Sequence, residues 1–312
     1  MRTLVTGGAG FIGSTLTDRL LAEGHQVDVV DDLSTGSLAN VAEARARHRG
    51  KFTFHRLDVR AAEMSDLIAH RRPELIFHLA AQADVRVSVN RPAFDAEVNI
   101  LGSLNVFQGA LTAGTAKVVF AGSGGTLYGI PEDVPVREGH PQRPISPYGV
   151  AKKAAGDYLH YYREVHGLEY TVLALANVYG PRQDPHGEAG VVAIFAGKML
   201  GRGRPTIFGD GAQTRDFVFV DDVVDAFVRA SEKAGGLIVN IGTGEETSVQ
   251  QLFDAIARIS GFKDPAHYAP ARPGELQRST LDPGRAAIHL GWKPWTSLDE
   301  GLRRTLDWFR QR

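Results

Sequence analysis

The sequence predicts an α/β protein with a doubly wound parallel sheet and a smaller, discontinuous α+β lobe. Short β-branched apolar runs alternate with helical patterns through the first half of the 312 residues. Gly and Pro become dense after about Val178, which is typical of loops over a surface site. Alternation of strands and helices implies right-handed crossovers, and these bury a parallel sheet between two layers of helices.

Six candidate strands precede this change in character. They cover residues 3–6, 26–31, 52–57, 75–79, 117–121 and 170–174. Helical patterns begin near Phe11, Ala61, Pro92 and Pro147. Each of these patterns lies between two of the strands, as a right-handed crossover requires.

Two later segments are interpreted as returns to the sheet. The first, RDFVFVDDVVDAFVRA, predicts a strand and then a helix capped by Asp221 or Asp222. The second predicts a final strand over residues 237–241. The first domain then comprises residues 1–177 with 215–242. Residues 178–214 with 243–312 form the second lobe, which has helices near 248–260 and 298–309. We expect the site at the carboxyl ends of the strands.

Composition restricts the class of protein. Hydrophobic residues make up 43% and charged residues 23%, as in average soluble domains, and a net charge of −1 gives no reason to expect nucleic acid or membrane as a partner. The absence of cysteine excludes disulfides and thiol catalysis, and the 11 histidines show no metal-ligand spacing, so no metal site is expected. The start MRTLVTGGAG lacks the features of a signal peptide, and no apolar run is long enough to span a bilayer. We therefore expect a cytoplasmic protein.

A glycine loop lies between the first predicted strand and helix. Gly8, Gly10 and Gly13 fit the pattern G-x-G-x-x-G, in which glycines admit a pyrophosphate and the helix N-terminus favours its charge. Asp31 ends the second strand, where an acid accepts hydrogen bonds from a ribose. A carboxylate there repels the 2′-phosphate of NADP, and no Arg follows within the next few positions, so NAD is favoured. Asp58, after the third strand, either reaches the adenine amine or caps the turn that follows it.

A Tyr–Lys pair predicts the chemistry. Ser146 is a natural N-cap and Pro147 suits the first helical position, so Tyr148 and Lys152 lie one turn apart on the same helix face. A phenol with an ordinary pKa of ~10 is a poor base at neutral pH. A nearby ammonium and the positive end of the helix both favour the phenolate. Such spacing is common by chance, but together with the glycine loop it predicts a base that takes a proton from an alcohol while hydride leaves the same carbon.

Six motifs resemble the extended short-chain dehydrogenase/reductases, and among these the bacterial UDP-glucose (UDP-galactose) 4-epimerases. They are TGGAGFIGS, HLAAQ, NILGSLNV, SGGTLYG, SPYGVAK and NVYGPRQ. The resemblance covers Met1 to about Arg310. It implies a Rossmann-type domain that binds NAD permanently, and a second lobe that binds a nucleoside-diphosphate sugar.

The resemblance also implies cofactor contacts at the pyrophosphate, at the adenosine and along the path to the nicotinamide. In that order, these contacts come from Gly7, Gly10, Phe11, Ile12 and Gly13; from Asp31, Asp32, Asp58 and Val59; and from Leu79, Ala80, Ala81, Asn99, Tyr148 and Lys152.

One position departs from the family pattern. The family's third catalytic residue is a Ser or Thr that lies four residues before the Tyr of a T/S-x-Y-G motif. In this chain that Tyr is Tyr128, and the position four residues before it is Gly124. The neighbouring hydroxyls are those of Ser123 and Thr126. Either could bond the reacting sugar oxygen, and the alternative is a flexible turn at the strand end.

Further positions match the family's substrate contacts. Asn177, Arg215 and Arg272 match residues that bind the sugar diphosphate, and the planar fork of Arg suits phosphate oxygens. A solvated surface charge is the alternative for either Arg.

The uracil and the sugar ring have their own expected contacts. Val191, Val192 and Phe195 begin a helix that we expect to meet the uracil. Ser279 matches a position that gates the C2 substituent of the sugar, and a small residue there leaves space for an N-acetyl group.

The sequence therefore predicts an NAD-dependent 4-epimerase of a UDP-hexose, with N-acetylated sugars as possible substrates. A secondary alcohol is inverted by transient oxidation at C4, rotation of the 4-keto sugar and re-reduction. A rival 4,6-dehydratase carries Asp-Glu after its active-site Thr, where this chain has Gly124 and Gly125. A UDP-glucuronate epimerase or decarboxylase is a second rival, for which Arg86 could bind the carboxylate. A non-catalytic NAD sensor would not need the dyad.

The resemblance also implies a homodimer. In the family, the helices that here begin near Pro92 and Pro147 pair across a twofold axis as a four-helix bundle. Most of their apolar positions, among them Leu104, Phe107, Leu159 and Tyr162, are expected to belong to the core.

Overall fold

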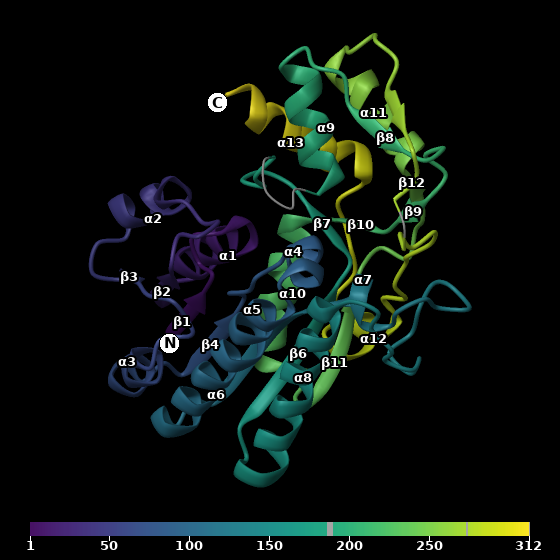
Figure 1. Ribbon diagram of the computed structural model, residues 1–312. Helices are drawn as coiled ribbons and strands as arrows, with labels where there is room; N and C mark the ends of the chain where they lie inside the picture. The colour runs from purple at the N-terminus through teal and green to yellow at the C-terminus, as the bar shows by residue number, and fades with distance from the viewer. Residues whose placement is uncertain (186–189, 273, 312) are drawn as a thin grey trace.

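A computed structural model describes residues 1–185, 190–272 and 274–311 (Figure 1). Within these residues, a seven-stranded parallel sheet has the order β11-β6-β5-β4-β1-β2-β3. The strands are β1 Arg2–Thr6, β2 Gln26–Asp31, β3 Phe52–Arg56, β4 Leu75–His78, β5 Lys117–Ser123, β6 Glu169–Leu175 and β11 Leu237–Ile241. All six strands predicted in the first half and the predicted final strand are confirmed, and the fold is the Rossmann-type α/β fold that was expected.

Helices cover both faces of this sheet. On one face lie α3 Glu63–Arg71, α6 Gly102–Ala113 and α8 Pro147–His166; on the other lie α1 Phe11–Ala22 and α10 Val220–Glu232. Successive strand residues alternate between two buried cores: Leu4 and Ile76 belong to the core under α6, whereas Val5 and Phe77 belong to the core under α1 and α10. This period of two is what a strand buried on both faces requires.

The segment RDFVFV does not return to the main sheet, so that prediction is wrong. Strand β10 (Phe217–Phe219) pairs instead with β7 (Asn177–Tyr179) in a separate two-stranded sheet. The reason is competition for one edge: β11 occupies the side of β6 that β10 would need.

The predicted cap of the following helix is also wrong. Helix α10 begins at Val220, and Phe219 stands at its N-cap without a side-chain hydrogen bond. The buried carboxylate of Asp222 turns away from its own helix and accepts hydrogen bonds from Trp295 N (3.1 Å), Thr296 N (3.0 Å) and Thr296 Oγ1 (2.6 Å). These hydrogen bonds therefore join α10 to residues 295–296, which lie just before the last helix.

The smaller lobe lies beyond the carboxyl ends of the strands, at the top of Figure 1. It contains α9 Val191–Leu200, α11 Val249–Ser260 and α13 Leu298–Arg310, the parallel pair β8 Thr206–Phe208 and β13 His267–Ala269, and the antiparallel pair β9 Thr214–Arg215 and β12 Thr247–Ser248. The two predicted helices near 248–260 and 298–309 are confirmed as α11 and α13. Short elements complete the fold: η1 Leu38–Val41, α2 Ala42–Arg47, α4 Val85–Asn90, α5 Pro92–Ala96, the π-helical η2 Glu97–Leu101, α7 Gly124–Leu127 and α12 Gly284–His289.

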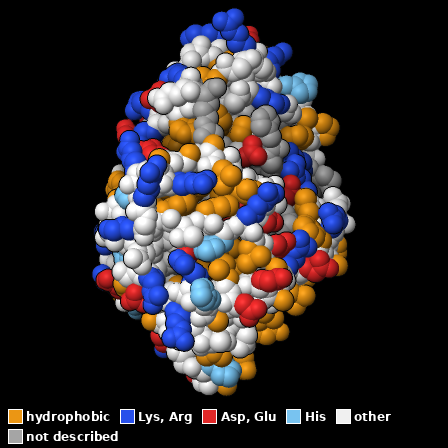
Figure 2. Space-filling model, turned by 90° about the vertical axis from the view of Figure 1, so that its left-hand side faces the viewer, with side chains coloured by type: hydrophobic (Ala, Val, Ile, Leu, Met, Phe, Trp, Pro, Cys, Tyr) orange, Lys and Arg blue, Asp and Glu red, His pale blue; other side chains and the backbone are white. Residues whose placement is uncertain are grey.

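Figure 2 shows the side of the molecule that lies to the left in Figure 1, towards α1 and α2. Hydrophobic side chains lie across its middle, among Lys and Arg, and both signs of charge occur on this face, in agreement with the net charge of −1. Among the described residues, no helix has the length and apolar character that a membrane span needs.

Candidate active site

The strand order reverses between β1 and β4. At such a switch point, an open α/β sheet binds its ligand in the crevice outside the carboxyl ends of the strands. The glycine loop leaves β1, and residues 79–81 leave β4. Gly7 has φ +67°, and a Cβ on it would lie 2.8 Å from the amide nitrogen of Ala80. A Cβ on Gly13 would overlap the carbonyl oxygen of Gly7. Only glycine fits at these two positions, because a Cβ at either one would come too close to backbone atoms of a neighbouring segment.

The loop also leaves a helix N-terminus open. Gly10 is the N-cap of α1, and no side chain of the described chain caps that helix. Uncapped amides at a helix N-terminus bind phosphate oxygens through hydrogen bonds and the helix dipole. The geometry at Phe11, Ile12 and Gly13 therefore fits the pyrophosphate of a dinucleotide.

Asp31 fastens the glycine loop to the end of β2. Its buried carboxylate accepts hydrogen bonds from the amides of Ala9 (2.9 Å) and Leu33 (2.8 Å). Burial raises the pKa of Asp31, and the two amides oppose that rise. The adjacent Asp32 is exposed and bonds Ser34 N (2.9 Å) and Oγ (2.6 Å). Both acids thus stand where a ribose would reach the loop.

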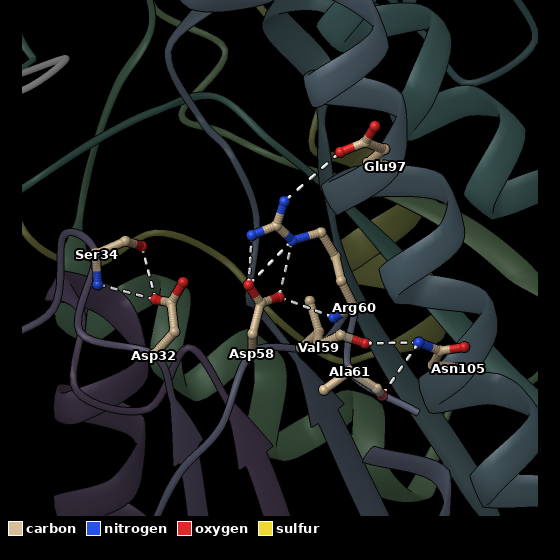
Figure 3. Close-up of polar contacts among 8 residues, drawn as sticks. All are labelled: Asp32, Ser34, Asp58, Val59, Arg60, Ala61, Glu97 and Asn105. Carbon is tan, nitrogen blue, oxygen red and sulfur yellow. Dashed lines mark hydrogen bonds and ion pairs between the residues drawn. The ribbon is translucent and has the colours of Figure 1, made fainter. Parts of the chain in front are cut away.

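Figure 3 shows the expected adenine side of the crevice. The Arg60 guanidinium donates hydrogen bonds to both carboxylate oxygens of Asp58 and lies 3.6 Å from the Glu97 carboxylate. The backbone amide of Arg60 donates to Asp58 Oδ1 at 2.8 Å. These bonds lower the pKa of the Asp58 carboxyl. The side chain of Val59 is buried, and its carbonyl accepts from Asn105 (3.0 Å). Asp58 therefore caps its own turn, which was the alternative to an adenine contact, and an adenine amine would have to share it with Arg60.

The Tyr–Lys pair lies on the first turns of α8, as predicted. Ser146 Oγ accepts from Gly149 N (3.2 Å) and Pro147 opens the helix. The Lys152 Nζ lies 4.7 Å from the ring centroid of Phe120 and 5.8 Å from that of Tyr148. Burial lowers the pKa of Lys152 to about 8. The buried ammonium therefore faces two aromatic rings, and its charge acts more strongly on a neighbouring phenol than it would in water.

Both candidate hydroxyls lie near this pair. Ser123 and Lys152 line the same cavity of about 460 Å³. Thr126 packs against the start of α8, because a Cβ on Gly149 would lie 3.2 Å from the Thr126 Cβ. The glycine at position 124 has a steric cause: a Cβ there would overlap the side chain of Leu281. A side chain at position 124 would thus require the Leu281 side chain to move.

A buried hydrogen-bond chain runs beneath the crevice. Thr6 Oγ1 accepts from the amides of residues 79–80 (3.2 Å each), so its own hydrogen points to His78 Nδ1 (2.7 Å). His78 Nε2 then donates to Ser103 Oγ (2.9 Å), which donates to the carbonyl of Asn99 (2.7 Å). Each hydroxyl in this series donates its one hydrogen to a defined acceptor. His78 is therefore neutral and carries its proton on Nε2. Sequence reasoning missed this chain, although HLAAQ contains the histidine.

Asn99 lies in the π-helical segment η2, a type of irregularity frequent at functional sites. Its amide accepts from Gln82 N (3.0 Å) and donates to Gln82 O (2.9 Å) and to Asp95 Oδ1 (2.9 Å). The residues predicted along the nicotinamide path, 79–81 and Asn99, are therefore joined through Gln82.

The two predicted diphosphate arginines are differently placed. The half-buried Arg215 bonds the carbonyls of Thr214 (2.7 Å) and Leu276 (2.9 Å) and lies 3.2 Å from Glu275. The exposed Arg272 stacks on Phe208, 3.9 Å from its centroid. Arg215 lies on β9, which pairs with β12, and Arg272 follows β13, so both stand outside the seven-stranded sheet.

The predicted uracil contacts are partly wrong. Val192 and Phe195 are each 1% exposed and belong to the core, because α9 turns them towards α11. Val191 is half-buried and Asn177 is exposed, so both remain accessible to a ligand. Ser279 Oγ lies 3.9 Å from the position of a Cβ on Gly125, which places it beside the turn that carries the candidate hydroxyls.

Among the residues that the structure describes, no cluster of three or more His, Asp or Glu could hold a metal ion. A glycine-loop crevice at the switch point of a parallel sheet, beside a Tyr–Lys pair with a buried ammonium, defines a nicotinamide-dependent enzyme of the short-chain dehydrogenase type.

Comparison with known proteins agrees with this class. The model of the NAD dependent epimerase/dehydratase family matches residues 3–242, and the chain belongs to that family. A UDP-glucose 4-epimerase of Mycolicibacterium smegmatis is 51% identical over 100% of this chain and 99% of its own. The crystal structure of the Thermotoga maritima UDP-glucose 4-epimerase with UDP-glucose is 46% identical, with a TM-score of 0.96 over 100% of this chain and 99% of that one. The Thermus thermophilus UDP-glucose 4-epimerase complex with NAD is 43% identical, with a TM-score of 0.92 over 99% of each chain.

The hydrogen-bond chain predicts a pH dependence of stability. Burial, with the Lys152 charge as a smaller cause, lowers the pKa of His78 to about 3, whereas an unfolded histidine titrates near ~6.5. Between these values the unfolded state binds one more proton, so stability rises with pH across the window and is lost as pH falls. We expect His78→Gln to remove about 1.4 kcal/mol per pH unit of this slope.

Urea unfolding between pH 4 and pH 6 measures the slope. His160→Gln, on the exposed side of α8, is the matched control and should keep the wild-type slope. Equal slopes for His78→Gln and the wild type would contradict a neutral buried His78.

Proposed function

We propose that the chain is an NAD-dependent 4-epimerase of a UDP-hexose, with UDP-galactose and UDP-glucose as the first pair to test. The observation that carries the proposal is the buried Lys152 ammonium beside Tyr148, next to the crevice between β1 and β4. The epimerases with which the chain shares its fold and about half of its sequence support the substrate class. We assign residues 1–177 with 215–242 to NAD binding and 178–214 with 243–312 to the nucleotide sugar, in a cytoplasmic enzyme.

The residues divide the reaction between them. NAD, bound in the crevice, supplies a hydride acceptor that later returns the hydride to C4. The Tyr148 phenolate takes the proton of the C4 hydroxyl, and the Lys152 ammonium stabilises the negative charge on the phenol oxygen. Ser123 or Thr126 bonds the sugar oxygen. Once the 4-keto sugar has turned about its diphosphate, the other face of C4 is presented for reduction, and Tyr148 gives the proton back to the C4 oxygen.

The smaller lobe holds the substrate in this proposal. Asn177, Arg215 and Arg272 bind the diphosphate, and Val191 contacts the uracil. Arg215 already bonds a backbone carbonyl and pairs with the Glu275 carboxylate. A diphosphate would therefore displace Glu275 or share the Arg215 guanidinium with it. Anchorage at the diphosphate leaves the hexose free to rotate, as a 4-epimerase requires.

The rival functions find less support in the geometry. A 4,6-dehydratase needs an acid and a base where Gly124 and Gly125 stand, and Leu281 fills the space of a side chain at position 124. Arg86, considered for a uronate, lies on α4 and pairs with its N-cap Asp84 at 2.7 Å. This ion pair gives Arg86 a structural role at the surface, beside the N-cap of α4.

Tyr148→Phe tests the function. Loss of the phenol should lower UDP-galactose turnover by about 10²- to 10⁴-fold, because proton transfer loses its base. NAD should remain bound, as mass spectrometry of the purified protein would detect. Tyr268→Phe, on the exposed strand β13, is the matched control and should turn over normally. Full activity of Tyr148→Phe, or no interconversion of UDP-hexoses by the wild type, would overturn the proposal.

We further propose that Ser279 admits N-acetylated sugars. Its position beside Gly125 places a small side chain at the turn that carries the candidate hydroxyls. Two small residues facing each other leave space for a bulky C2 substituent.

Ser279→Tyr should remove that space. Turnover of UDP-N-acetylgalactosamine relative to UDP-galactose should fall at least about tenfold, since a filled pocket excludes the larger substrate. Ser279→Ala keeps the space and should leave the ratio unchanged. An unchanged ratio in Ser279→Tyr would remove the argument.

We also propose a homodimer through α6 and α8, which contact each other along one face of the sheet. Helix α8 presents an exposed apolar stripe at helical spacing, formed by Val150, Tyr158, Tyr161 and Val165. Exposed Leu101 precedes α6. By contrast Phe107, Leu159 and Tyr162 are buried, as predicted for the core.

Val165→Glu tests the dimer, because two copies would bring two charges into one apolar interface. Sedimentation equilibrium should give about twice the chain mass of 33.8 kDa for the wild type and the chain mass for the variant. Ile288→Glu, at an exposed apolar position on α12, should stay dimeric. A monomeric wild type would contradict this assembly.

A further inference from the structure

Asp95, the fourth residue of α5, is a fully buried carboxylate that the proposed reaction does not use. Its Oδ1 accepts from Gln82 Nε2 (2.8 Å) and Asn99 Nδ2 (2.9 Å). Its Oδ2 is out of contact with solvent and has no hydrogen-bond partner in the described part of the chain. A buried carboxylate is strongly unfavourable unless a positive charge compensates it, so the surroundings of Oδ2 need an explanation.

A nearby positive charge is that of Lys152. Burial raises the pKa of Asp95; the hydrogen bonds from Gln82 and Asn99, and after them the Lys152 ammonium, oppose that rise. In return the Asp95 charge raises the pKa of Lys152 against its own burial. Helices α5 and α8 pack against each other, so these two charges lie on adjoining elements.

The other titratable groups around Lys152 leave Asp95 as its counter-charge. Tyr148 comes from α8 itself, and its ring lies 5.8 Å from Lys152 Nζ. His78 comes from β4 and is neutral, since both of its nitrogens are committed to Thr6 and Ser103. Glu138 and Asp157 line the same cavity as Lys152, but Asp157 pairs with Lys153 (2.6 Å) and Glu138 lies 3.5 Å from Arg285, so Asp95 is left as the counter-charge of Lys152.

We propose that Asp95 is a positioning residue of the dyad: it orients Asn99 through Oδ1 and supplies the buried negative charge that keeps Lys152 protonated. One carboxylate thus links the expected nicotinamide contact at Asn99 to the ammonium beside Tyr148. The turnover part of its test rests on the proposed function, whereas the spectroscopic part does not.

Asp95→Asn keeps the shape and an acceptor oxygen but removes the charge. In NAD-loaded protein labelled with ¹³C at the lysine ε-carbon, the Lys152 signal is assigned by its absence in Lys152→Arg. Its titration midpoint should fall by on the order of one pH unit in Asp95→Asn, because an opposite charge has been removed from a buried site.

The chain offers two internal controls. Lys117, at the start of β5, is also buried, with a pKa lowered to about 8, and should keep its midpoint. Asp222→Asn neutralises a second buried carboxylate, with partners at Trp295 and Thr296, and should leave Lys152 unchanged. An unchanged Lys152 midpoint in folded Asp95→Asn would overturn the proposal.

A second measurement needs no change at Asp95. In wild-type protein labelled at the aspartate γ-carbon, one carboxyl signal should shift with the midpoint of Lys152, and Lys152→Met should abolish that inflection. The coupling is thereby tested even where Asp95→Asn does not fold. Absence of any such signal would also overturn the proposal.

Turnover supplies the functional readout. The alkaline limb of kcat should move to lower pH in Asp95→Asn, with kcat at pH 8 reduced about fivefold as the protonated fraction of Lys152 falls from about one-half to about one-tenth. KM for the UDP-sugar should not change, because Asp95 does not contact the diphosphate lobe. If the wild type turns over no UDP-hexose, the proposed function fails while the titrations still decide the role of Asp95.

Discussion

The crevice depends on the close approach of three backbone segments at the carboxyl end of β1. Gly7 lies against the amide of Ala80, and Gly13 against the carbonyl of Gly7, so strand, loop and helix meet without intervening side chains. Asp31 fastens the loop from the β2 side and Thr6 Oγ1 fastens residues 79–80 from below. A side chain at Gly7 would push the loop after β1 away from the residues that follow β4, and one at Gly13 would push α1 away from the loop.

This rigid floor places neutral groups beneath Lys152. Thr6 donates a hydrogen bond to His78, and His78 donates one to Ser103. A second proton on the imidazole would have no acceptor, so His78 stays neutral. Phe120 covers the ammonium with an aromatic face. In a site of low dielectric constant, an ammonium stabilises a neighbouring phenolate far more than it would in water.

The sequence predicted those features that depend on local patterns. Strands 26–31 and 237–241 follow from short apolar runs between turn residues, and the start of α8 follows from Ser146 and Pro147, whose effects reach one turn. The glycine loop and Asp31 were found because their spacing along the chain is itself the signal. These local features suffice to locate the crevice and the base.

Features set by competition between distant segments were not predictable in this way. The pattern of β10 indicates a strand but does not say that β11 takes the edge of β6. Phe195 lies at the start of an apolar helix, and only the packing of α9 on α11 decides that it faces the core. Asp95 and Gln82 are 13 positions apart, and no spacing rule links them.

The missing hydroxyl at position 124 is a further case in which a distant segment decides. Residues 280–282 cross to the first domain, where Thr280 O and Asp282 N both bond Val136 at 2.8 Å, and Asp216 Oδ2 accepts from Leu281 N (3.2 Å). These bonds hold the Leu281 side chain in the space that a side chain at position 124 would need.

The same crossing segment brings Ser279 to Gly125. The glycine pair and the small Ser279 are therefore two parts of one packing arrangement, in which the second lobe reaches the catalytic turn. A hydroxyl at position 124 would therefore require the Leu281 side chain to move. Ser123 and Thr126 remain the candidate hydroxyls, because the crossing segment leaves them in place beside Lys152 and the start of α8.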